Sequence, residues 1–184
     1  MKTIKFPSFL HEVFGREATL AEILMLLLIS LIAVFGLFIF TPTEWNELAL
    51  WKIALLFLLI FDVFAGFIAN LTLSTNNYYQ ENPKLRLVFI AIHIQPLIFS
   101  FLFGGYFQVC LVIWTYTTAA AFFVNAMKAY PAQKTLAASL VTLGLTGLLV
   151  ASHGLPLVLL TALVFYHLKV VYSFSVDQYA PREI

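Results

Sequence analysis

Charged residues are scarce in this sequence, which has ten Lys and Arg and nine Asp and Glu among its 184 residues. They make up 10% of the chain, whereas a soluble domain of average composition carries about 25%. The formal net charge of +1 excludes a basic field of the kind that attracts nucleic acid. Glycine (8) and proline (7) are also sparse, which excludes collagen-like and disordered chains.

The usual sequence motifs of metal and cofactor chemistry are missing too. The single cysteine, Cys110, lies in an apolar run and excludes a disulfide within the chain. No Gly-rich phosphate loop, HExxH or haem-attachment CxxCH is found. The four histidines, at positions 11, 93, 153 and 167, lack the i, i+3 or i+4 spacing of a helical metal site. We therefore predict no metal, and the sequence names no cofactor.

Long apolar runs dominate what is present: 62% of the residues are hydrophobic, and the mean hydropathy is +0.96. A transmembrane helix needs about 20 consecutive apolar residues. The runs of that kind are 19–40, 48–71, 84–103, 105–127, 135–151 and 155–171. We expect an all-α polytopic membrane protein whose six spans form one bundle over residues 19–171. Segment 1–18 precedes the bundle, and tail 172–184 follows it.

Local signals agree with these boundaries. Thr19 and Glu22 have the spacing of a capping box at the start of the first span. Pro42 and Pro83 suit the first helical position of the second and third spans. The link 72–81 is the longest and most polar in the chain, so it is a candidate lid over a cavity between the helices.

The distribution of positive charges predicts the orientation. Nine of the ten Lys and Arg residues fall in the N-terminal segment, in alternate links or at the C-terminal end, including Lys169, and only Lys52 departs from this pattern. The positive-inside rule therefore predicts that both termini are cytoplasmic and that the protein lies in the plasma (cytoplasmic) membrane. Residues 6–17 predict a short amphipathic helix, either on the cytoplasmic membrane surface or packed against the bundle.

Two ionisable residues lie deep in adjacent spans. Asp62 is nine residues from the predicted cytoplasmic end of the second span, and His93 is nine from that of the third. At helical rise both lie roughly 13 Å deep. Consecutive antiparallel helices are usually neighbours, so we expect the two side chains to meet. Ionisable groups cost free energy inside a membrane, and they usually mark functional sites there.

Other polar residues extend this candidate site. Asp62, Gly66 and Asn70 form one stripe on the second span, and Arg86 lies at the depth of Asn70 on the third. Pro96, which follows Gln95, predicts a kink beside His93. The candidate ligand- or ion-binding residues are Asp62, His93, Asn70, Arg86, Gln95, Asn76, Tyr78 and His167.

Three functions are compatible with such a site. The first is a carrier or permease subunit, in which Asp62 and His93 bind a proton or cation and the other residues hold a small polar solute. The second is a membrane enzyme acting on a lipid or isoprenoid, with His93 as acid or base and Arg86 holding a head group. The third is a structural or assembly protein whose polar residues only join helices. The lipid bilayer is the expected partner, and a chain of this size would act as a homo-oligomer or with partner membrane subunits.

Overall fold

A computed structural model describes residues 3–180, and six of its helical segments are long and apolar enough to cross a membrane. These segments are Leu20–Phe40, Leu50–Ala69, Pro83–Phe103, Phe107–Ala126, Gln133–Val150 and Leu157–Phe174. The predicted all-α, multi-pass architecture is confirmed, and every predicted boundary lies within three residues of the observed one. Lys2, Arg182 and the outermost residues of the predicted segments 1–18 and 172–184 lie outside the described residues.

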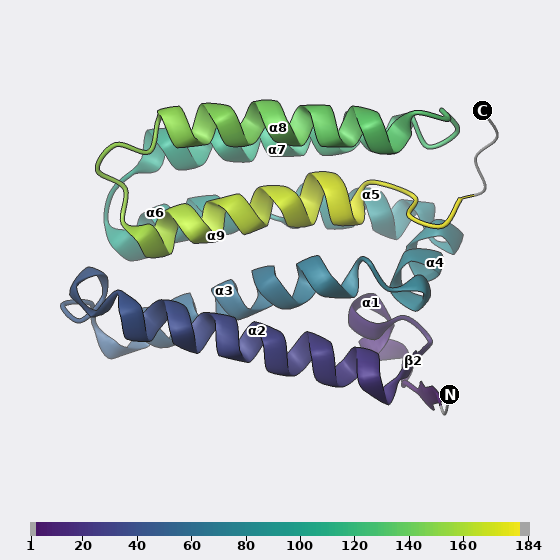
Figure 1. Cartoon of the computed structure of the whole chain (residues 1–184), viewed down its shortest axis with the longest axis horizontal. Coiled ribbons are helices and arrows are strands. Elements are labelled where there is room, and N and C mark those ends of the chain that lie inside the picture. Colours follow the sequence, from purple (N-terminus) through teal and green to yellow (C-terminus); the bar gives the residue numbers. More distant parts are fainter. Residues whose placement is uncertain (1–2, 181–184) are drawn as a thin grey trace.

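The spans lie side by side with their long axes roughly aligned (Figure 1). The helices are α2 (Leu20–Phe40), α3 (Leu50–Ala69), α5 (Pro83–Ile92) with α6 (Gln95–Phe103), α7 (Phe107–Ala126), α8 (Gln133–Val150) and α9 (Leu157–His167). A π-helix, η3 (Leu168–Phe174), continues α9. In Figure 1, α2 and α3 lie on one side of the bundle and α7 and α8 on the other.

The short elements distinguish the two ends of the bundle. One end carries β1 (Thr3–Lys5), η1 (Ser8–Leu10), α1 (His11–Phe14), β2 (Glu17–Thr19) and α4 (Leu73–Glu81). We call it the α4 end. The other, which we call the η2 end, carries the 3₁₀-helix η2 (Pro42–Glu44).

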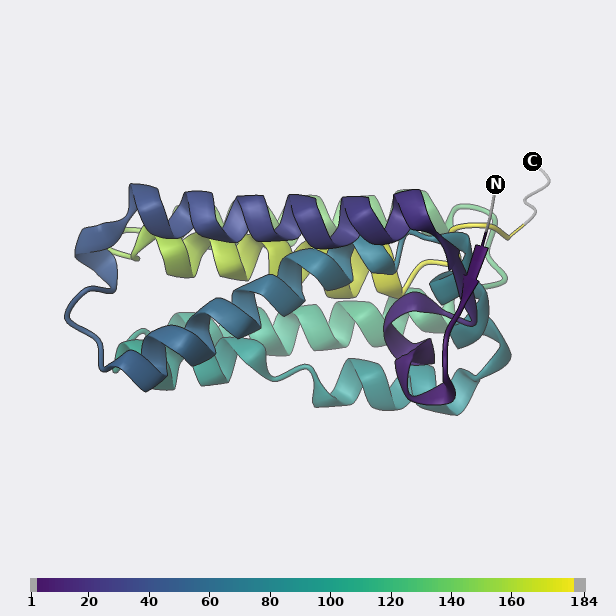
Figure 2. The same ribbon diagram turned by 90° about the horizontal axis from the view of Figure 1, so that it is seen from below.

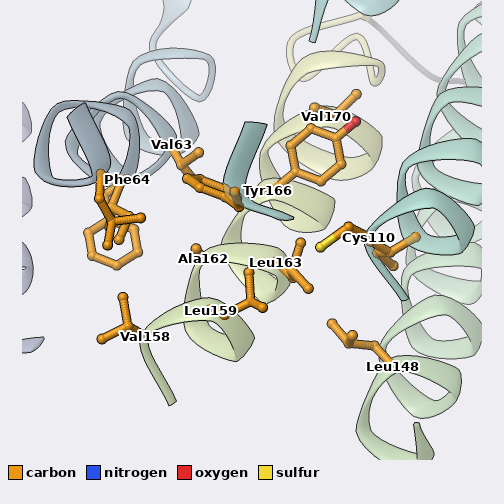
Figure 3. Packing of buried hydrophobic residues seen from close by; sticks show 14 of the residues in the cluster. Val63, Phe64, Cys110, Leu148, Val158, Leu159, Ala162, Leu163, Tyr166 and Val170 are labelled. Atoms are coloured by element: carbon orange, nitrogen blue, oxygen red, sulfur yellow. The ribbon is translucent and has the colours of Figure 1, made fainter. Parts of the chain in front are cut away.

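The last span forms the centre of the bundle. Of the 18 residues in this span, 61% are buried within the chain, against 22–44% of the most apolar 18-residue stretch in each of the other five spans. Figure 3 shows why: Leu159 and Leu163 of α9 lie between Val63 of α3 and Cys110 of α7. Because the outer spans face lipid on one side, only the central span has partners in most directions.

The third span is broken into α5 and α6 by His93 and Ile94 (Figure 2). Pro96 occupies the first turn of α6, where its missing N–H is harmless. Within one continuous helix, that N–H would have been needed to bond the carbonyl of Ile92. The kink predicted beside His93 is therefore present as a complete interruption of the helix.

The N-terminal segment does not form the single amphipathic helix predicted over residues 6–17. Instead, β1 and β2 pair antiparallel, and the short helices η1 and α1 lie between them. Gly15, with φ +69°, ends α1 so close to Ser74 that any side chain would collide with the backbone of α4. The segment packs against the bundle because this turn brings α1 onto α4.

The polar link 72–81 is a helix, α4, and not an irregular loop. Thr72 caps it by accepting a hydrogen bond from the backbone N–H of Thr75 at 3.4 Å. The hydroxyls of Thr75 and Tyr79 donate to the carbonyls of Val13 (3.1 Å) and Glu12 (3.3 Å). These bonds fix α4 to the N-terminal segment.

At the η2 end, the Thr-Pro-Thr-Glu stretch has a role that its local pattern does not indicate. Pro42 begins the short η2, whereas the second span begins only at Leu50. The carboxylate of Glu44 instead accepts hydrogen bonds from the backbone N–H groups of Leu157 and Val158, both at 2.8 Å. Glu44 therefore caps α9, a helix more than one hundred residues later.

Candidate functional site

An ion pair lies inside the bundle, between α3 and η3. The ammonium nitrogen Nζ of Lys169 donates to Oδ2 of Asp62 at 2.8 Å and to the carbonyl of Asp62 at 3.3 Å. The amide Nε2 of Gln95, at the start of α6, donates to the same Oδ2 at 3.1 Å. Three spans thus meet at one carboxylate, which can accept several such bonds.

The two charged groups differ in exposure. The side chain of Lys169 is 2% exposed, whereas that of Asp62 is 55% exposed. The side-chain bonds from Lys169 and Gln95 both end on Oδ2 of Asp62, and no hydrogen bond to Oδ1 is formed among the described residues. The buried Oε1 of Gln95 has no partner among residues 3–180 either. Two acceptor oxygens are therefore left without donors at this site.

Gly66, one turn after Asp62, allows the lysine to reach the pair. A Cβ atom at position 66 would stand 2.8 Å from Nζ of Lys169. Because glycine has no side chain, a neighbouring group can approach the backbone of α3 closely at this point. The group that approaches is the side chain of Lys169.

The π-helix gives Lys169 a local setting different from that of an α-helical residue. In η3, the hydroxyl of Ser173 donates to the carbonyl of Lys169 at 2.9 Å. The hydroxyl of Ser175 likewise donates to the carbonyl of Val170 at 2.7 Å. Side-chain hydroxyls thus satisfy carbonyls near the end of the span. Single π-turns in helices often occur at functional sites.

The break in the third span lies next to the ion pair. The carbonyl of His93 accepts a hydrogen bond from the hydroxyl of Tyr166 at 2.9 Å, so α9 holds the broken backbone in place. Nδ1 of His93 forms a short hydrogen bond with the carbonyl of Phe89. Non-helical backbone is tolerated at membrane depth only where protein groups or water satisfy it.

An aromatic cluster closes the same region toward the α4 end. The rings of Phe89 and Phe174 are stacked with centroids 3.7 Å apart, and the ring of His93 lies 3.7 Å from that of Phe89. Nζ of Lys169 lies 5.8 Å from the centroid of Phe89, within the range of a cation–π interaction. The ammonium group therefore lies near one carboxylate, one backbone carbonyl and one apolar ring.

Asp62 and His93, which we expected to meet, interact electrostatically but are not bonded to each other. Among the described residues, no hydrogen bond or ion pair joins the two side chains. The break at His93 changes the direction of its side chain, which bonds within its own helix. Gln95 and Lys169 occupy the carboxylate instead.

The predicted polar layer of Asn70 and Arg86 is also not formed. Arg86 is buried, and its Nη2 donates to the carbonyl of Phe174 at 2.9 Å. Its guanidinium carbon lies 5.6 Å from the centre of the Phe174 ring. Asn70 is buried at the end of α3, and its Nδ2 has no partner among residues 3–180. The last span, which lies at the centre of the bundle, provides the partner of Arg86.

The three other candidate residues contact different elements. Nδ2 of Asn76 donates to the carbonyl of Val176 at 3.3 Å. The ring of Tyr78 lies 5.7 Å from that of His11, edge to face. Nδ1 of His167 is hydrogen-bonded to Oγ1 of Thr117 on α7 at 2.7 Å. None of the three hydrogen-bonds with Asp62 or Lys169.

Lys169 is the residue of this site that sequence reasoning missed. We expected it among the cytoplasmic charges at the C-terminal end, and it lies inside the bundle instead. The residues after it, Val170 to Phe174, include two valines and two aromatic residues, which could have indicated that the span continues. Among residues 3–180, no group of three or more His, Cys, Asp or Glu is placed to hold a metal ion.

The fold and this site define a class: a multi-pass, all-α membrane protein with a charged pair between its spans. No protein-family model, curated protein or solved structure matches the chain.

Proposed function

We propose that the chain is a small carrier or permease subunit whose coupling site is the pair of Asp62 and Lys169 together with Gln95. The observation that carries the proposal is the ion pair itself, at 2.8 Å between two spans and beside a broken helix. A pair of opposite charges costs free energy to bury, and a hydrophobic substitute is often no less stable. Its presence inside a membrane bundle therefore favours a function over a purely structural role.

The unpartnered oxygens suggest what the site binds. Oδ1 of Asp62 and Oε1 of Gln95 both accept hydrogen bonds, and neither has a donor among the described residues. A proton or a small ammonium-bearing solute would supply the missing donor. Either would weaken the attraction between Asp62 and Lys169, and the last span would then be able to move relative to α3.

The neighbouring backbone supports such a movement. Transporters commonly place their binding sites at discontinuous helices. Here the third span is interrupted at His93 and Ile94, and the last span changes from α- to π-helix at Leu168. Both irregular segments adjoin the ion pair. The half-exposed side chain of Asp62 is not enclosed by the protein.

We further propose that the α4 end is cytoplasmic and that the protein lies in the plasma membrane. Among the described residues, the positive charges at that end are Lys5, Arg16, Lys84, Arg86, Lys128 and Lys134. Lys52 lies at the η2 end, and Lys169 is buried in the bundle. This asymmetry follows the positive-inside rule without counting Lys169.

Proteoliposomes test the carrier proposal directly. Vesicles with an internal pH-sensitive dye would report proton movement under an imposed potential, and uptake of radiolabelled putrescine and lysine would be measured in parallel. We expect wild-type protein to move protons or one of these amines. Asp62→Asn should abolish the flux, and Asp62→Glu should keep part of it, because the carboxylate is retained.

A matched control is Glu47→Gln, which removes an exposed carboxylate at the η2 end and should leave the flux unchanged. The proposal fails if Asp62→Asn transports as well as the wild type. It also fails if wild-type vesicles do not differ from empty ones for protons and for every amine tested. The pair would then be a structural contact between helices.

A further inference from the structure

A second polar site lies at the α4 end, apart from the ion pair. A cavity of about 260 Å³ opens there between α4, the start of α5 and the end of α7. Its lining comprises Tyr79, Gln80, Pro83, Arg86, Leu87, Asn125, Ala126 and Lys128. The described lining contains two cations and two amides and no Asp or Glu. The cavity therefore offers hydrogen-bond donors from two cationic and two neutral amide side chains.

Arg86 is the central group of this cavity. The residue is 3% exposed, yet its Nε has no hydrogen-bond partner among residues 3–180. Only Nη2 is bonded, to the carbonyl of Phe174. Burying a guanidinium N–H removes its hydrogen bonds to water, which costs free energy. No group among the described residues replaces those bonds. Arg86 lines the cavity, and a shift of its side chain would bring the buried Nε to a ligand there.

Gln80 supplies a second unpaired donor. Its amide Nε2 is buried and has no partner among the described residues, and it comes from α4, whereas Arg86 comes from α5. Asn125 and the exposed Lys128 extend the donor set from the end of α7. Asp177, which is not part of the cavity lining, interacts electrostatically with Arg86.

We propose that this cavity binds a negatively charged phosphate group. Arginine Nε and Nη atoms together match the spacing of two phosphate oxygens, and a lysine adds a further point charge. The cavity lies at the α4 end of the spans, the level at which the head groups of a membrane crossed by these helices would lie. The phosphate could therefore belong to an anionic lipid or to a free phosphate compound, because the recognition chemistry is the same.

The test separates these two sources. Wild-type protein in nanodiscs of neutral phosphatidylcholine would be titrated with inorganic phosphate by calorimetry. In parallel, nanodiscs with phosphatidylglycerol would be analysed by native mass spectrometry for lipid that stays bound. Saturable binding of inorganic phosphate supports a free phosphate, and retained phosphatidylglycerol supports a head group.

Variants link the binding to the cavity. For whichever probe binds the wild type, we expect Arg86→Gln to lower the affinity by about tenfold, since a charge-assisted hydrogen bond is lost. Because a buried arginine can be needed for folding, Lys128→Gln and Gln80→Met serve as second variants at an exposed and a half-buried position. Each of these should weaken binding by about threefold.

The control is Lys84→Gln, which removes an exposed cation at the same end but outside the cavity lining. It should bind either probe as the wild type does. The proposal is overturned if neither probe binds wild-type protein. It is equally overturned if Lys84→Gln weakens binding as much as Lys128→Gln, because the attraction would then be a general surface effect.

Discussion

The ammonium group of Lys169 and the carboxylate of Asp62 form an ion pair at 2.8 Å in which one partner is 2% exposed and the other 55%. The two residues are 107 positions apart in the sequence. The pair is thus asymmetric: loss of the carboxylate would leave a buried cation, whereas loss of the lysine would leave an accessible carboxylate. This asymmetry leads to our first prediction.

Asp62→Asn should destabilise the protein more than Lys169→Met. An uncompensated buried charge costs roughly 3–5 kcal/mol, and the asparagine variant leaves Lys169 in that state. The carboxylate left by Lys169→Met is 55% exposed and not enclosed by the protein, so we expect a smaller loss in the free energy of unfolding. Thermal unfolding followed by tryptophan fluorescence in one detergent would compare the two variants.

The double variant Asp62→Asn, Lys169→Met is the internal control for that comparison. It removes both charges, so it should be more stable than Asp62→Asn alone. A larger loss for Lys169→Met than for Asp62→Asn would show that the lysine packs for reasons other than its charge.

Gly66→Ala should disturb the ion pair by filling the space that Lys169 occupies. The added methyl group would contact the end of the lysine side chain, which is buried and has little room to move. Overpacking of this kind costs about 1–3 kcal/mol. Gly36→Ala is the matched control, since nothing lies within 4 Å of a Cβ there. Equal unfolding temperatures for the two variants would contradict the predicted crowding.

Glu44→Ala should destabilise the start of the last span. The change removes two hydrogen bonds of 2.8 Å to the first turn of α9 and a favourable interaction with the helix dipole. We expect a loss of about 1–2 kcal/mol in the free energy of unfolding. Glu47→Ala, in the same loop, should have little effect. Faster amide exchange at Leu157 and Val158 in the Glu44 variant would locate the loss.

Tyr79 should make the stability of the α4 end dependent on alkaline pH. Burial, and to a lesser extent Glu12 and Tyr78, raise the pKa of its hydroxyl above the ordinary value of 10.0. The neutral hydroxyl donates to the carbonyl of Glu12 at 3.3 Å. Because the pKa is higher in the folded state, the contribution is fully present below about pH 10 and decreases as the pH rises further.

Unfolding temperatures of wild type and Tyr79→Phe, measured from pH 8 upward, test this dependence. The wild type should be the more stable at pH 8, and its advantage should shrink above about pH 10. A difference that stays constant over the whole range would show that the hydroxyl does not titrate with folding.

Several features of the fold could be predicted because their causes are local or come from the lipid. A run of apolar residues must cross the membrane as a helix, since no water is present to bond its backbone. The capping box of Thr19 and Glu22 is confirmed because both of its residues lie within one turn. Pro83 starts α5, and Pro96 lies in the first turn of α6 after the break, because proline lacks the N–H that a helix interior needs.

The composition of the site was only partly predictable. Asp62 was identified because a carboxylate inside a membrane span costs free energy and usually marks a functional site. Gln95 was identified because it precedes the predicted kink. Lys169, the main partner of Asp62, was placed at the membrane surface because positive charges near the end of a span normally lie there. The last span continues as a π-helix to Phe174, three residues beyond its predicted end, and Lys169 is buried within it.

The sequence by itself determined the number of spans, their ends to within three residues and a kink in the third, since each depends on residues within a few positions. The tertiary structure decided which side chains meet: Lys169 with Asp62, Glu44 with the start of α9, and Arg86 with Phe174. The physical reason is that contacts between spans depend on the rotation and relative position of each helix. Those are set by packing around the central last span, which no local pattern encodes.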